Sequence, residues 1–63
     1  MRRLSGMYDG VEHIVLEYPH GRVECPSDLR QVLQNDDGSL PTGTELESAL
    51  RLLCGDTLVV REI

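Results

Sequence analysis

Four side chains in this sequence have the chemistry to bind a transition metal: His13, His20, Cys25 and Cys54. Zinc sites usually place imidazole and thiolate ligands in close pairs, such as Cys-x-x-Cys or His-x-x-x-His. Here consecutive candidates are seven, five and twenty-nine residues apart, so no such pair exists. We therefore expect no metal site and no cofactor. A very small metal-binding protein, with His20 and Cys25 meeting near a hairpin turn, is kept as an alternative.

The same side chains, with the carboxylates, are the candidates for catalysis. Nucleophilic catalysis needs a nucleophile and a base within hydrogen-bonding distance, and no spacing in this chain indicates such a pair. Cys54 ends a predicted helix, where the negative pole of the helix dipole disfavours a thiolate. The acidic run at residues 35–38 cannot be a calcium loop, because Leu33 and Thr44 occupy the two positions that need acids. We expect that the protein is not an enzyme.

Composition and charge narrow the class of partner. Eleven acidic residues against six arginines give a net charge of −5. A basic surface that neutralises phosphates is the usual basis of nucleic-acid binding, so the charge argues against DNA, RNA and anionic membranes as partners. No stretch approaches the roughly 20 apolar residues of a membrane span. With only two cysteines and no signal peptide pattern, we expect a cytoplasmic protein with reduced thiols.

The strongest strand signal runs from residue 11 to residue 18, where side chains of two kinds alternate. One set is expected to face the core: Ile14, Leu16 and Tyr18. The other set is expected to face outward: Val11, His13, Val15 and Glu17. Residues 19–22 form a turn and residues 22–25 return as a second strand, with Tyr18 opposite Val23 and Leu16 opposite Cys25.

Two amphipathic helices and a last strand follow. Ser27 and Asp28 are typical of a helix start, and the turn residues 35–39 end that helix. A second helix begins near Thr44, and its apolar side chains recur at helical spacing: Leu46, Ala49, Leu50 and Leu53. The last strand, residues 57–63, is apolar on both faces. It suits either a central strand or an edge strand that a second copy of the chain covers.

These elements predict one α+β domain at residues 10–63, after a flexible N-terminal arm at residues 1–9. The expected fold is a β-hairpin–helix–helix–strand domain, in which two helices pack on a three-stranded sheet. The hairpin, the helix and a terminal strand opened by Gly55-Asp56 also resemble the β-grasp arrangement of ubiquitin-like and TGS-type domains, over about residues 11–63. That resemblance implies a last strand between the hairpin and the rest of the sheet. It does not imply sulfur-carrier function, because Arg61-Glu62-Ile63 stands where carrier members have Gly-Gly.

With little chemistry visible, the sequence favours a small acidic regulatory or accessory protein that acts by binding another protein. We expect a homodimer, because a chain of 63 residues has a small core and gains stability from a partner. Strand addition is the expected mode. The residues predicted to bind the partner are Val11, His13, Val15, Val59 and Arg61. The main alternative is a DNA-associated transcriptional regulator or antitoxin-like protein, which needs four arginines to cluster: Arg2, Arg3, Arg22 and Arg51.

Overall fold

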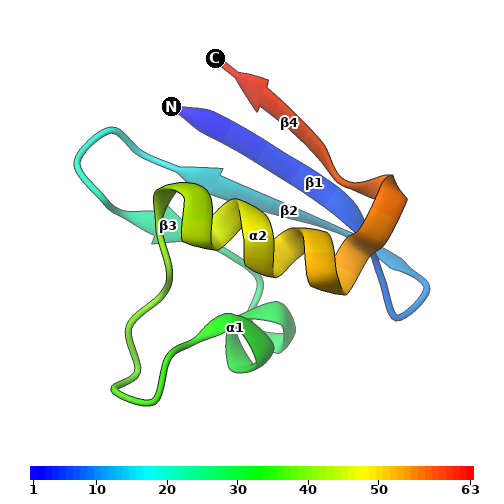
Figure 1. Cartoon of the computed structure of the whole chain (residues 1–63), viewed down its shortest axis with the longest axis horizontal. Coiled ribbons are helices and arrows are strands. Elements are labelled where there is room, and N and C mark those ends of the chain that lie inside the picture. The colour runs from blue at the N-terminus through cyan, green and yellow to red at the C-terminus, as the bar shows by residue number, and fades with distance from the viewer.

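The structure is a computed structural model that describes all of residues 1–63. Four antiparallel strands form one sheet, and the helices lie between β3 and β4 in the chain (Figure 1). The strands are β1 (Arg2–Tyr8), β2 (Val11–Glu17), β3 (Val23–Glu24) and β4 (Val59–Glu62). The helices are α1 (Ser27–Leu33), α2 (Gly43–Cys54) and the short 3-10 helix η1 (Gly55–Thr57). The predicted α+β class is confirmed, and the predicted number of strands is corrected from three to four.

The additional strand is β1, which lies in the segment predicted to be a flexible arm, residues 1–9. It pairs with β2 along its whole length, from Arg2 opposite Glu17 to Tyr8 opposite Val11. The tight turn between them is Asp9-Gly10, with φ of 54° and 77°. Positive φ at both turn residues suits the twist of a two-residue hairpin and favours the Asp-Gly pair. The Asp-Gly pair therefore indicates a hairpin in the sequence, but the polar and glycine residues at positions 2–8 give that segment no clear strand pattern.

The face of β2 that packs on the core is the one predicted to point outward. Val15 lies opposite Leu4 of β1, and both side chains are buried. Ile14, predicted to be in the core, is 40% exposed on the other face. The β2–β3 register differs in the same way, since Leu16 is opposite Glu24 and not Cys25. Both faces of β2 carry aliphatic side chains, so alternation alone does not determine which face the helices cover.

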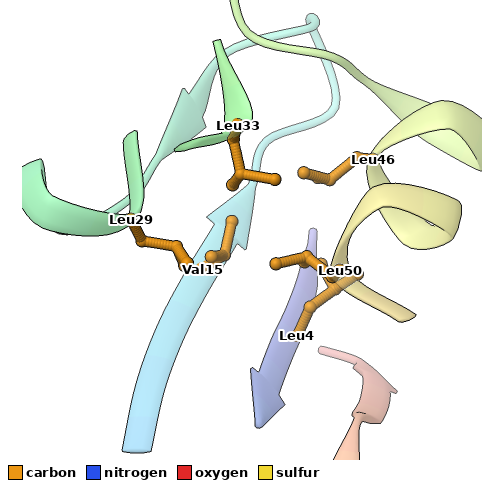
Figure 2. Packing of buried hydrophobic residues seen from close by; sticks show 6 residues of the cluster. All are labelled: Leu4, Val15, Leu29, Leu33, Leu46 and Leu50. Carbon is orange, nitrogen blue, oxygen red and sulfur yellow. The ribbon is translucent and has the colours of Figure 1, made fainter. Parts of the chain in front are cut away.

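Both helices pack against the Val15 face of the sheet. Figure 2 shows leucines of α1 and of α2 converging from two sides on the pair from β1 and β2. The six buried residues of this core are Leu4, Val15, Leu29, Leu33, Leu46 and Leu50. The stripe predicted for the second helix is confirmed, because two of its members are in the core and Ala49 and Leu53 pack against it. The core is aliphatic, as expected of a chain without Phe or Trp.

Strand β4 is an edge strand. The order in the sheet is β3-β2-β1-β4, and β4 runs antiparallel to β1. A β-grasp domain would place the last strand between the hairpin and the rest of the sheet. Here it lies outside β1, so the β-grasp alternative is wrong for this chain, and one long side of β4 has no neighbouring strand.

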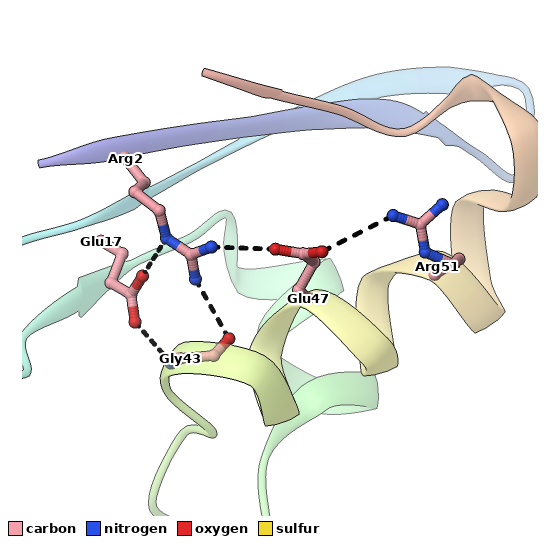
Figure 3. Close-up of polar contacts among 5 residues, drawn as sticks. All are labelled: Arg2, Glu17, Gly43, Glu47 and Arg51. Atoms are coloured by element: carbon pink, nitrogen blue, oxygen red, sulfur yellow. Dashed lines mark hydrogen bonds and ion pairs between the residues drawn. The ribbon is translucent and has the colours of Figure 1, made fainter. Parts of the chain in front are cut away.

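Hydrogen bonds made by charged side chains connect the sheet to the start of α2 (Figure 3). Arg2 Nε donates to a Glu17 carboxylate oxygen at 2.6 Å, and its Nη atoms donate to Glu47 at 2.9 Å and to the Gly43 carbonyl at 3.0 Å. The other Glu17 oxygen accepts the Gly43 N–H at 2.6 Å. Glu17 thus supplies the helix cap and a negative charge at the positive end of the dipole. The side chain of Thr42, the residue before the helix, makes no capping hydrogen bond, and Glu47 contacts Arg2 and also Arg51, 3.6 Å away.

This arrangement predicts a loss of stability in acid. The Gly43 N–H, followed by Arg2, lowers the pKa of Glu17 below its usual value of 4.5. A carboxyl group with a lowered folded-state pKa stabilises the fold above its unfolded-state pKa, and that contribution is lost as pH falls through the folded-state pKa. We expect the melting temperature to fall as pH drops below about 4.5, and to fall less steeply in Glu17→Gln. Thermal melting by circular dichroism from neutral pH to pH ~2 measures both slopes. Parallel slopes would show that Glu17 has no part in the acid sensitivity.

Candidate interaction surface

The five residues predicted to bind a partner do not share one surface. His13 and Val15 are buried, at 6% and 1% exposure, on the face that the helices cover. Their predicted outward orientation is therefore corrected. Val11 is 58% exposed beside the Asp9-Gly10 turn, at the end of the same face. Val59 and Arg61 are exposed on the opposite face, on β4.

The candidate metal ligands and catalytic groups are also dispersed. His13 Nε2 lies 3.2 Å from the Tyr8 carbonyl inside the fold, and Cys54 packs against Gly6 at the end of α2. Burial raises the pKa of both cysteines, Cys25 and Cys54, which favours the less reactive thiol form. No three His, Cys, Asp or Glu residues are placed to share a metal ion, and the surface has no pocket.

The arginines that a DNA-binding patch would need are largely engaged with carboxylates. Arg2 and Arg51 both contact Glu47, and Arg22 lies 3.8 Å from Glu24 at the β2–β3 turn. Arg3 lies on the face of β1 opposite to that of Arg2. The charge of these groups is therefore mostly neutralised within the chain, and no helix presents a row of arginines.

The sheet face opposite the helices has no covering layer, and we call it the open face. In Figure 3, β1, β2 and β4 lie together on one side and α1 and α2 lie on the other. The pairing of the strands assigns Met7, Ile14, Leu16 and Val59 to it. Three of these are well exposed, at 44% for Met7, 40% for Ile14 and 48% for Val59. Large side chains of this kind on one sheet face normally pack against another layer, so the open face is a candidate binding surface.

The open face is basic near β4 although the chain is acidic. Arg3 lies directly opposite Arg61 in the β1–β4 pair. Neither guanidinium has a carboxylate within 4.0 Å. All the ion pairs of the protein are made by other arginines. The acids on this face are on other strands: Glu12 at the far end of β2 and Glu24 on β3. Like charges directly opposite each other destabilise a sheet, so this pair has a cost without a compensating contact inside the chain.

The free edge of β4 offers backbone hydrogen bonds beside this basic pair. The Ile63 N–H donates to the Met1 carbonyl at 2.9 Å, which places residues 59, 61 and 63 in the hydrogen-bonded positions facing β1. The alternation of an antiparallel ladder then directs the N–H and C=O groups of Val60 and Glu62 away from the sheet. Such a row of unpaired groups is a template for an added strand.

None of the helices combines the length and the apolar character needed to cross a membrane. Comparison with protein-family models, with curated proteins and with solved structures finds no match to this chain.

Proposed function

We propose that this protein is a small regulatory or accessory interaction module, which binds another protein through the open face and the β4 edge and performs no catalysis. The observation that supports the proposal best is the row of exposed aliphatic side chains on a sheet face without a covering layer. Burying them against a partner removes apolar surface from water, which is the main favourable term in protein association. The unpaired backbone groups of β4 would form hydrogen bonds with the partner and fix the orientation of its strand.

A second copy of the chain is one candidate partner, since a homodimer through the last strand is expected from the sequence. Dilution tests it, because the melting temperature of a protein stabilised by association depends on concentration. If two copies associate, the melting temperature falls over about a hundredfold dilution and light scattering reports twice the chain mass. A constant melting temperature and a single-chain mass would instead leave the open face to a different protein. We propose the cytoplasm as the site of action, on the basis of the composition and the two free thiols.

Photo-crosslinking in the cells that make the protein tests the proposed surface. A photoreactive side chain replaces Ile14 or Val59 on the open face, and Val32 or Leu52 in two control variants. The controls are also exposed and apolar, at 46% and 88%, but lie on the helices. We expect a discrete protein adduct from the open-face positions and none of that mass from the helix positions. Equal adducts from all four positions, or none from Ile14 and Val59, would refute the assignment.

A further inference from the structure

Two registers are available if β4 pairs with β4 of a second copy, and each has a defect. A register that uses the outward groups of both Val60 and Glu62 places Arg61 opposite Arg61 of the other copy. With Arg3 beside each, four guanidinium groups would lie in one row across the open face. Like charges directly opposite are destabilising, and no carboxylate of the chain approaches this row.

The other register is centred on Val60 and brings Glu62 opposite Leu58 of the second copy. The Leu58 N–H is already donated to the Gly55 carbonyl, at 3.2 Å, in the 3-10 turn before β4. The pairing would then lack one of its hydrogen bonds or would open that turn. The edge is therefore poorly suited to a second copy, although its backbone groups are unpaired.

A strand that carries a carboxylate would complement both the arginine pair and the unpaired backbone groups of this edge. A carboxylate opposite Arg61 would neutralise the arginine pair that the chain itself leaves uncompensated. Apolar side chains at its neighbouring open-face positions would extend the layer of Val59 and Ile63, and its backbone would bond to Val60 and Glu62. We infer that β4 receives an extended acidic and apolar segment of another protein, added as an antiparallel strand with a carboxylate opposite Arg61. The inference rests on the proposed interaction function and adds the chemistry of the partner.

Two blocked peptides test the inference on the intact chain: Val-Thr-Glu-Thr-Val and Val-Thr-Lys-Thr-Val. They differ only at the residue that would face Arg61, which is acidic in one peptide and basic in the other. Titration into isotope-labelled protein, followed by amide chemical shifts, detects weak binding and locates it. We expect the Glu peptide to shift the amides of Val60 and Glu62 and to bind roughly fivefold more tightly than the Lys peptide, in line with a cross-strand ion pair in a partly exposed site.

A charge reversal at the proposed contact provides the decisive comparison. In Arg61→Glu the preference should reverse, so that the Lys peptide binds more tightly. The fold is expected to tolerate this change, because Arg3 then lies opposite a carboxylate. Arg30→Glu on α1 is the matched control, since Arg30 is exposed, has no ion pair and changes the net charge equally. The control should keep the preference for the Glu peptide, which separates a local contact from the attraction of the whole protein.

Equal affinity for both peptides, shifts that avoid β4, or the same reversal in Arg30→Glu would each overturn the inference. The β4 amides could also become concentration-dependent without peptide, which would identify a second copy as the occupant and overturn it as well. These failures leave the photo-crosslinking result at Ile14 and Val59 untouched. An adduct at those positions without a charge preference at β4 would mean that the interaction function stands and the acidic-strand inference fails.

Discussion

Gly6→Ala is expected to lower the free energy of unfolding by about 2 kcal/mol, the size typical of overpacking a core. A Cβ at position 6 would lie 2.7 Å from Cys54 Cβ and 2.8 Å from its Sγ, and 3.4 Å from the Leu58 Cα. The missing side chain is what allows the end of α2 to pack directly on β1. The expected sign is informative, because alanine in place of glycine at an unobstructed site stabilises a protein by about 0.4–1 kcal/mol.

Urea unfolding followed by circular dichroism measures this effect. Ser5→Ala is the matched control, because Ser5 is the next residue of β1 and its side chain lies on the open face. The control should change the free energy of unfolding by no more than about 0.5 kcal/mol. If Gly6→Ala is neutral or stabilising, the close contact of α2 with β1 is wrong.

Arg2→Met is expected to lower the free energy of unfolding by about 2 kcal/mol, because it removes three charge-assisted hydrogen bonds and leaves Glu17 with one fewer partner. Methionine keeps the apolar stem, so the loss reports the polar contacts and not the packing. The side chains of Arg2 and Glu17 are 21% and 13% exposed, which limits the screening of their ion pair by solvent.

Arg3→Met provides the comparison at the adjacent position. Arg3 has the same side chain and the same strand, but it makes no ion pair and faces Arg61. Its replacement should leave the stability within about 0.5 kcal/mol or raise it slightly. Equal losses in the two variants would show that the contacts of Arg2 with Glu17, Glu47 and Gly43 do not hold the helix to the sheet.

The parts of the fold that local sequence determines agree with prediction. The helix predicted from Ser27 is α1, and the stripe containing Leu46 and Leu50 identifies the buried side of α2. A helix repeats every 3.6 residues, so a stripe of leucines specifies one face without reference to the rest of the chain. The hairpin of β2 and β3 is also present, although its register is shifted by one residue.

The parts of the fold that depend on pairing between strands cannot be predicted from the local alternation of side chains. In β2, Val15 on one face and Ile14 on the other are comparably apolar. The alternation of side chains therefore does not decide which face packs on the core. The choice is made by β1, which brings Leu4 opposite Val15 and Arg2 opposite Glu17. The local signal that would have indicated β1 is the Asp9-Gly10 pair between two runs of suitable length.

This inversion of faces changes the candidate surface. The outer face predicted for the hairpin included His13 and Val15, which lie in the interior, whereas the uncovered side carries Met7, Ile14 and Leu16. The β4 residues of the prediction, Val59 and Arg61, lie on the open face and remain in the proposal. The arginine pair could not be predicted from the sequence, because Arg3 and Arg61 are separated by nearly the whole chain.

The helices cover the Val15 face of β2 and leave the Ile14 face open, and both interaction proposals depend on this arrangement. Methyl–methyl nuclear Overhauser effects in the unmodified protein test it directly. We expect contacts from the Val15 methyl groups to the leucines of α1 and α2, and none from Ile14 to either helix. Contacts between Ile14 and those leucines, with Val15 free of them, would contradict the fold and remove the basis for the open face.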